Sequence, residues 1–437
     1  MKRVLMAMTA ATALSLVAAC ATAAGGGSAG ANACGSAKVR LPILAWNGGD
    51  CFKEGVHNIN KDYFRELYDA GYTITMEDAK TVERAKEIMD AAHKEGVKIC
   101  LRMPQLRDVK TAAGIVAQVK DHPALDSYYV VDEPRANSFK KWGELIKVIQ
   151  AADSKHRVYV NAFGIDAGKV WYMLPDFETY IKHYLDEMHL DWFSFDMYPV
   201  TAKNRFLKNN KIPFAHEGVE KELKPTWFKC FEVVQSICRE RKIPFSAFAL
   251  TVPHTNSGKW DYPPHTVGEL KLESYVALAY GAESLQHFTY RCPGHHSRFH
   301  NAPIDYDTAR RTPMYDRVRE VNRELNDRAY VFVGADMPTV AYLGPTLPEG
   351  VKKCESFPAF VKTLEVADGS ALVSTFKNNG KEYVMVVNCE LEREITLNAT
   401  FDAGVKRILK DGAKVDVSRQ DGVYWLSVGD AEIFVKE

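Results

Sequence analysis

Residues 127–134 read Ser-Tyr-Tyr-Val-Val-Asp-Glu-Pro, an apolar and aromatic run that ends in two adjacent carboxylates. Similar short runs alternate with amphipathic segments such as Thr81–Glu95 from Val39 to about Asn326, and such runs are typical of buried strands. The runs that predict strands are Val39–Trp46, Tyr72–Met76, Val97–Met103, Ser127–Val131, Arg157–Ala162, Asp191–Met197, Phe245–Val252 and Ser284–Tyr290. Strand and helix repeated in this way predict an α/β fold, a closed (β/α)₈ barrel of the TIM type.

The chain changes character after a helix predicted at Arg310–Asn326. Helical periodicity ends there, and short β-rich runs follow, separated by turn signals such as Asn378-Asn379-Gly380. The runs are Val361–Val366, Ala371–Thr375, Tyr383–Val387, Glu394–Leu397, Val405–Ile408 and Tyr424–Ser427. We expect the barrel over 38–330 and a small all-β sandwich over 331–437. An open doubly wound sheet is the alternative to the barrel, but no GxGxxG motif follows the first run.

The N-terminus has the pattern of an export signal. Lys2-Arg3 precede an apolar stretch that closes on Leu16-Val17-Ala18-Ala19-Cys20, which resembles a bacterial lipobox. We expect a signal peptide over 1–19, a diacylated Cys20 and a Gly/Ala/Ser-rich flexible tether over 20–37. Plain cleavage near an Ala-x-Ala site is the alternative. The protein is then exported and anchored to a bacterial membrane, at the periplasmic face or the cell surface.

Composition favours a neutral partner. The 56 Lys and Arg residues balance the 56 Asp and Glu residues, so no long-range field attracts nucleic acid or an anionic bilayer, and a neutral partner, of which a carbohydrate substrate is one kind, fits best. Trp46, Trp171, Trp192 and Trp260 fall near predicted strand ends, where they suit sugar stacking, although buried aromatic residues more often belong to a core. The nine cysteines show no tight disulfide framework and no CxxC pair, so no bridges are assigned.

Polar residues at the ends of the predicted strands are the candidate site, because barrel active sites form at the carboxyl ends of the strands. The candidates are Trp46, Asn47, Arg102, Asp132, Glu133, Asn161, Asp196, Tyr198, His254, His287 and Tyr290. Carboxylates, an amide and aromatic rings on one rim suit glycosidic bond cleavage, which needs a proton donor and a second charged group. The histidines around Cys292 lack an HExxH or paired CxxC pattern, so no metal or other cofactor is expected.

Three longer segments resemble bacterial lipoproteins with a glycoside-hydrolase barrel, related to the clan that includes beta-galactosidases. They are Tyr128–Pro134, Trp192–Pro199 and Tyr275–Tyr290, and the tail Leu426–Phe434 resembles the sandwich that follows such barrels. The resemblance covers about Leu41 to Asn326. It implies a glycosidase with an acid/base Glu after strand four, which maps onto Glu133.

The chain departs from that family where strand seven ends. The family commonly places a nucleophilic Glu there, but this sequence reads Ala249-Leu250-Thr251-Val252-Pro253-His254. Asp196 is one candidate for the second carboxylate. Asp132 is the other, because the Asp132-Glu133 pair resembles that of substrate-assisted hexosaminidases. A non-catalytic glycan-binding lipoprotein with a degenerate glycosidase barrel is the alternative function.

The ring of Pro134 restricts the residue before it, so we expect Glu133 to be extended and to point to the rim. If Asp132 and Glu133 both face the pocket, their repulsion raises one pKa and leaves a protonated acid beside a charged partner. Glu133 is expected to be that acid.

Lipidation of Cys20 is directly testable. We expect the mature protein to begin at Cys20 with a diacylglyceryl thioether and to fractionate with membranes, because the lipobox follows a short apolar segment. Mass spectrometry of the N-terminal peptide checks this, with Cys20→Ser as the control that should not be lipidated. An unmodified Cys20 in the membrane fraction, or a protein released into the medium, would contradict the prediction.

Overall fold

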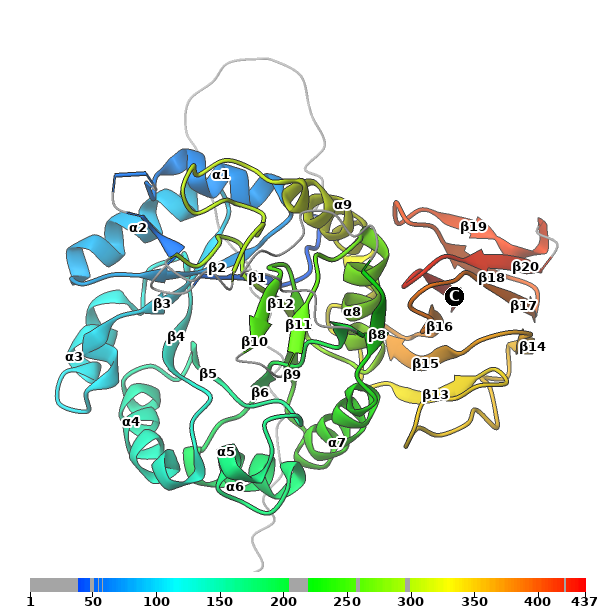
Figure 1. Ribbon diagram of the computed structural model, residues 1–437, viewed down its shortest axis with the longest axis horizontal. Helices are drawn as coiled ribbons and strands as arrows, with labels where there is room; N and C mark the ends of the chain where they lie inside the picture. Colours follow the sequence, from blue (N-terminus) through cyan, green and yellow to red (C-terminus); the bar gives the residue numbers. More distant parts are fainter. Residues whose placement is uncertain are drawn as a thin grey trace, which may run out of the picture. The chain divides into compact units, whose positions relative to one another are not determined.

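Eight parallel strands form the barrel sheet, in the order β5-β4-β3-β2-β1-β12-β9-β6 (Figure 1). They are β1 (Ile43–Trp46), β2 (Ile74–Asp78), β3 (Lys98–Arg102), β4 (Leu125–Asp132), β5 (Arg157–Asn161), β6 (Phe193–Phe195), β9 (Phe245–Leu250) and β12 (Ser284–Phe288). A parallel bridge between Ala162 and Phe195 joins β5 to β6 and closes the ring, and the Ala162 N–H donates to the Ser194 carbonyl at 2.8 Å. The TIM-barrel prediction is confirmed, and every predicted strand overlaps an observed one.

The computed structural model describes residues 38–47, 51–53, 55–56, 58–203, 219–256, 260–294, 299–419 and 422–437. The predicted signal peptide, Cys20 and nearly all of the predicted tether lie outside these residues. Over the described ranges, no helix combines the length and the apolar character that crossing a bilayer requires.

Helices cover the outside of the strand ring (Figure 1). They are α1 (Lys61–Asp69), α2 (Val82–Lys94), α3 (Ala112–Val119), α4 (Phe139–Ala152), α5 (Lys169–Tyr172), α6 (Phe177–Met188), α7 (Thr226–Arg241), α8 (Val267–Ala279), α9 (Pro313–Asp327) and α10 (Ala329–Phe332), with 3₁₀ turns at Pro104–Arg107, Ala136–Ser138 and Val417–Arg419. In α2 the Thr81 hydroxyl caps the first turn, and the apolar face predicted from the sequence is buried. Short antiparallel pairs lie in the loops, formed by β7 (Val200–Ala202) with β8 (Lys221–Leu223) and β10 (His254–Asn256) with β11 (Trp260–Tyr262).

Strand alternation divides the barrel side chains into two layers. Leu44, Trp46, Met76, Cys100 and Tyr129 pack together inside the ring, while their sequence neighbours pack against the helices outside. This division decides which residues at the strand ends can reach the site.

The C-terminal strands form two antiparallel sheets packed face to face. The larger sheet is β13 (Thr339–Leu343), β15 (Ala371–Asn378), β16 (Lys381–Asn388), β21 (Ala431–Lys436), β18 (Val405–Ile408) and β19 (Lys414–Asp416), and the smaller is β14 (Val361–Val366), β17 (Ile395–Phe401) and β20 (Val423–Leu426). The predicted Asn-Gly turn joins β15 to β16, with φ of 48° at Asn379 and 75° at Gly380. The predicted sandwich is therefore present, and β13, β19 and β21 are strands that the sequence patterns missed.

The sandwich packs directly against α8. Residues 269–279 of this helix are all buried, and the Ser374 hydroxyl of β15 donates to the Ala279 carbonyl at 2.7 Å. Residues 39–437 form one compact unit, and barrel and larger-sheet side chains share one hydrophobic core. The domain boundary near residue 330 remains a prediction.

Arg328 links the two parts through a buried guanidinium that is only 1% exposed. It donates to the Tyr275 hydroxyl at 2.9 Å and to the carbonyls of Leu409, Ala431 and Ile408 at 3.0, 3.1 and 3.2 Å. Glu324 supplies the countercharge at 3.5 Å. One side chain thus satisfies acceptors on the barrel and on the sandwich.

Replacing this side chain should destabilise the whole protein. We expect Arg328→Met to lower the free energy of unfolding by about 2–4 kcal/mol, because the buried carbonyls of Leu409, Ala431 and Ile408 lose their donor, whereas Glu324 keeps Lys271 at 2.7 Å. Urea denaturation measures the change. Arg319→Met is the matched control, since Arg319 lies on exposed α9 surface with Asp316 at 2.9 Å; a change under about 1 kcal/mol is expected there. Equal losses in the two variants would refute the role given to Arg328.

Candidate active site

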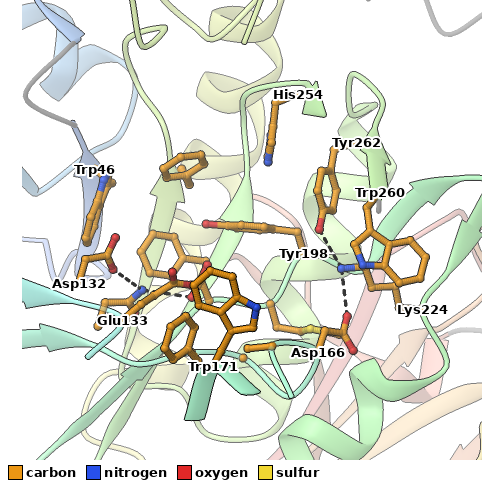
Figure 2. Close-up of a pocket in the computed structure, with 18 of the residues that line it drawn as sticks. Trp46, Asp132, Glu133, Asp166, Trp171, Tyr198, Lys224, His254, Trp260 and Tyr262 are labelled. Carbon is orange, nitrogen blue, oxygen red and sulfur yellow. Dashed lines mark hydrogen bonds and ion pairs between the residues drawn. The ribbon is translucent and has the colours of Figure 1, made fainter. Parts of the chain in front are cut away.

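A cavity of about 570 Å³ lies at the carboxyl ends of the barrel strands. Aromatic rings make up much of its wall, namely Trp46, Phe163, Trp171, Tyr198, Phe248, Trp260, Tyr262, Phe288 and Phe299. The carboxylates Asp132, Glu133 and Asp166 open onto the same space, together with Lys224 and His254 (Figure 2). Asp196 also lines this cavity. Polar groups converging in an aromatic-lined cavity are typical of a small-molecule or glycan site.

Asn161 connects two of the carboxylates. Its Nδ2 donates to Asp132 Oδ1 and to Asp196 Oδ1, both at 3.2 Å. The orientation of this amide is fixed in turn, because the Ser194 hydroxyl donates to Asn161 Oδ1 at 2.9 Å and Gln286 Nε2 donates to the Ser194 oxygen at 2.8 Å. The ends of β4, β5 and β6 are therefore joined by hydrogen bonds that continue into the barrel interior.

A β-bulge in β4 directs Asp132 into the cavity. Tyr129 packs inside the barrel, but both Val130 and Val131 pack in the core outside it, and the register with β5 shifts between Tyr129 and Val131. Without this shift, strand alternation would turn Asp132 outward. Bulges of this kind commonly re-aim a side chain next to an active site.

Glu133 follows the bulge with a φ of 45°, in the left-handed region that non-glycine residues rarely adopt. Its N–H donates to the Asn161 carbonyl at 2.8 Å, and the Tyr180 hydroxyl holds the next carbonyl, that of Pro134, at 3.0 Å. The expectation of an extended Glu133 is wrong. The N–H of Glu133 is still hydrogen-bonded to β5, but the chain must turn away from the strand at the same residue. The left-handed backbone conformation of Glu133 makes this turn.

Glycine at position 164 lets the loop after β5 cross close to the next strand end. A Cβ added there would lie 2.1 Å from the Asp196 carbonyl oxygen. Any side chain would push this loop away from Asp196, so the close approach requires glycine.

Burial raises the pKa values of all three clustered carboxylates, and repulsion by neighbouring carboxylates raises those of Asp196 and Glu133 further. Burial raises the Asp132 pKa against the opposing effects of the Asn161 hydrogen bond and the Arg102 charge, and burial and then the Asp132 charge raise the pKa of Asp196. The pKa of Glu133 rises furthest, from burial and then from the Asp196 and Asp132 charges. Asp132 and Glu133 remain open to solvent through the cavity, so water screens part of these effects. Glu133 is thus the group that keeps its proton to the highest pH.

A second polar group lies across the cavity from the carboxylate cluster (Figure 2). Lys224 Nζ forms an ion pair with Asp166 Oδ2 at 3.1 Å and donates to the Tyr262 hydroxyl at 2.9 Å, and it lies 4.8 Å from the centre of the Trp260 ring. None of these residues was among the predicted candidates. They come from loops and from the β8 and β11 region, whose position in space no strand pattern indicates, although Trp260 was noted as an aromatic residue suited to sugar stacking.

The cavity brings together most of the predicted site residues. Those that line it are Trp46, Asp132, Glu133, Asn161, Asp196, Tyr198 and His254. The His254 ring is stacked between Tyr262 and Phe299, with centroids at 4.5 and 4.9 Å, and its Nδ1 lies 3.0 Å from the Val252 carbonyl. The chemical roles of these residues remain predictions.

Four predicted residues lie outside the cavity lining. Asn47 donates to Tyr63 and Thr75 at 3.0 and 3.1 Å, and the buried His287 contacts the Tyr72 hydroxyl at 2.9 Å. Tyr290 packs against Tyr72 and Tyr63 outside the ring, and Arg102 pairs with Asp78 beside the Tyr129 ring. Asn47 and His287 each follow an inward-facing residue, so alternation points them outward.

Among the noted tryptophans, Trp46, Trp171 and Trp260 line the cavity. Trp192 does not, since it is buried in the barrel interior and donates to the Val158 carbonyl at 3.1 Å.

The cysteines Cys51, Cys100, Cys230, Cys238, Cys292, Cys354 and Cys389 are free thiols, and all but Cys354 are buried. Across the described ranges, His, Cys, Asp and Glu side chains form no group of three or more arranged to hold a metal ion.

Comparison with known proteins points to a glycoside-hydrolase-like barrel. The family model described as beta-galactosidase (glycoside hydrolase family 42) matches residues 170–328, which is less than half of the chain. The match covers the end of the barrel from α5 to α9, and it includes Asp196 but not Glu133. No curated protein matches the sequence.

Solved structures with similar folds include several carbohydrate-active enzymes. Amy13B of Eubacterium rectale aligns with a TM-score of 0.50 at 9% identity, over 92% of this chain and 96% of that one. The endo-beta-1,4-mannanase of Thermotoga petrophila aligns at 0.44 and 12% identity, over 89% and 98%. The beta-galactosidase of the psychrophilic Marinomonas ef1 aligns at 0.46 and 11%, over 66% of this chain and only 60% of that protein's length. At 9% identity the likeness to Amy13B concerns the fold alone.

The raised pKa of Glu133 predicts a pH-dependent cost to stability. Below the ordinary carboxyl pKa of about 4.3 both folded and unfolded chains hold the proton, but above it only the folded chain does, so stability falls as pH rises. We expect Glu133→Gln to melt with wild type near pH 4 and on the order of 2 °C higher near pH 8.

Thermal melts across that range check this prediction. Glu144→Gln on exposed α4 surface is the matched control and should follow wild type throughout. A Glu133→Gln protein that melts below wild type at pH 8 would rule out the electrostatic cost.

Proposed function

We propose that the protein is a glycoside hydrolase that acts on an oligo- or polysaccharide. The observation that carries this proposal is the convergence of Asp132, Glu133 and Asp196 on one aromatic-lined cavity at the carboxyl ends of the strands. Glycosidic cleavage needs a carboxylic acid to protonate the leaving oxygen and a carboxylate to stabilise the oxocarbenium-like centre, and aromatic walls bind sugar rings. The beta-galactosidase family match supports the same reaction class.

Glu133 is the proposed general acid and base. It has the most strongly raised pKa of the three, so it is protonated when the substrate binds, and the φ of 45° fixes its position at the turn after β4. Backbone held in a sparsely populated region is a recurrent feature of functional sites.

The second carboxylate is Asp196 or Asp132. Both carboxylates accept a hydrogen bond from Asn161 Nδ2 at 3.2 Å, so the same amide positions them both. Asp196 would act from β6 as the nucleophile or base, whereas Asp132 would act with its neighbour Glu133 on a substrate that supplies its own nucleophile, such as an N-acetyl group. Tyr198, Trp46, Asn161 and His254 would contact the sugar.

A glycan-binding protein with a degenerate barrel is the second candidate. The observation that favours it lies at the end of β9. Among the described residues, no carboxylate that follows this strand lines the cavity, and the Leu250 N–H donates to the buried Glu273 of α8 at 2.6 Å.

We also propose export and anchoring through Cys20, on the strength of the lipobox pattern.

Variants at Glu133 test the hydrolase. Wild type is screened on a panel of aryl glycosides and natural glycans, and we expect Glu133→Gln to lower turnover on a natural glycan by about 10²–10⁴-fold, because general acid catalysis contributes that much. Aryl glycosides with good leaving groups should lose less, since they need less protonation. Glu144→Gln is the control with unchanged turnover.

The comparison of Asp132→Asn with Asp196→Asn then decides the second carboxylate. Full activity of Glu133→Gln on a natural substrate would refute the assignment. Glycan binding without turnover by wild type would favour the degenerate barrel.

A further inference from the structure

The short helix α5 carries exposed apolar side chains at the edge of the cavity. Val170, Trp171 and Met173 are 76%, 49% and 51% exposed. The other large hydrophobic side chains with comparable exposure among the described residues are scattered along the chain. Single exposed apolar residues are ordinary, but a cluster within one helical turn marks a binding surface.

Trp171 belongs both to this cluster and to the wall of the cavity that holds Glu133 (Figure 2). The guanidinium of Arg135 lies over its indole, with Cζ 4.5 Å from the ring centroid, and the Phe163 ring lies at 6.1 Å with the planes inclined at 51°. Arg135 is two residues beyond Glu133, so one loop carries the proposed acid and also braces the indole. The ring is fixed in place while half of its surface stays open.

We propose that Trp171 is a stacking platform for a second sugar ring of the glycan whose neighbouring ring lies at the carboxylates. The site would then take an extended chain of two or more sugars rather than a single sugar. This inference rests on the proposed function and names its substrate class. One face of a pyranose presents mainly C–H groups, and stacking on a fixed indole removes both apolar surfaces from water.

The position of the cluster favours a glycan over a lipid surface. Trp171 is continuous with a cavity in which Asp132 and Asp196 can carry negative charge, while Glu133 holds its proton and Lys224 balances Asp166; the remaining negative charge would oppose an anionic bilayer. Membrane-binding helices present a long apolar face beside many basic residues, whereas α5 is four residues long with Lys169 as its one basic residue. Arg135 is a positioning residue in this arrangement, because it acts through the indole.

The test separates binding from turnover. Glu133→Gln protein is titrated calorimetrically with β-linked gluco-, manno-, galacto- and xylo-oligosaccharides of one to six units, alone and combined with Trp171→Ala or Trp171→Phe. Trp425→Ala is the matched control, since Trp425 is a 63% exposed tryptophan on the sandwich. We expect Trp171→Ala to weaken binding of the longer sugars roughly tenfold while leaving the monosaccharide unchanged. Trp171→Phe should retain most of the affinity, and Trp425→Ala all of it.

Three results would overturn the platform. The first is a parent protein that binds no oligosaccharide more tightly than the monosaccharide. The second is a Trp171→Ala variant that weakens binding of all lengths equally, and the third is a Trp171→Ala variant that abolishes binding to phosphatidylglycerol vesicles. Length-dependent binding that Trp171→Ala removes supports the platform even where wild type hydrolyses no glycan, in which case only the proposed hydrolysis fails. If wild type hydrolyses aryl monoglycosides but binding does not depend on oligosaccharide length, the proposed hydrolysis is supported and the platform fails.

Discussion

Two hydrogen bonds from one amide hold the site of this protein together. Asn161 donates to Asp132 and Asp196, and each bond offsets part of the repulsion between carboxylates that share a cavity. The amide can do this only in one orientation, which the Ser194 hydroxyl and Gln286 fix from inside the barrel. Ser194 also supplies the carbonyl that closes the ring between β5 and β6. Ser194 therefore both closes the barrel between β5 and β6 and orients the amide that holds the two carboxylates.

The sequence predicted the barrel well because each of its strands is an apolar run that needs no distant partner to be recognised. The sandwich was predicted less completely. β19 has only three residues, Lys-Val-Asp, and becomes a strand through its pairing with β18. β13 and β21 are likewise strands because they pair with β15 and β16, and a local sequence pattern carries no information about such pairing.

At the candidate site, position after a strand predicted which elements reach the rim and most of the lining side chains, but it also selected Asn47, Arg102, His287 and Tyr290, which do not line the cavity. Trp46 faces inward and Asn47 outward, and the same holds for Gln286 and His287, so the two-residue alternation separates lining residues from core. Asp132 breaks this rule because of the β4 bulge, which no sequence pattern indicated. Lys224 and Asp166 lie on loops whose approach depends on the finished fold.

The burial of α8 has a consequence for how the chain is made. This helix is buried on all sides, although it carries Glu269, Lys271 and Glu273, and one of its faces is covered by β15, β16 and the turn around Gly429, all of which are synthesised later. At ribosomal speeds of about 5–20 residues per second, the sandwich-facing side of this helix stays uncovered in the nascent chain for on the order of ten seconds. The C-terminal strands thus complete the burial of a barrel helix. A chain truncated after α9 would expose this helix face and would be prone to aggregation, so that a chaperone or a protease would be needed.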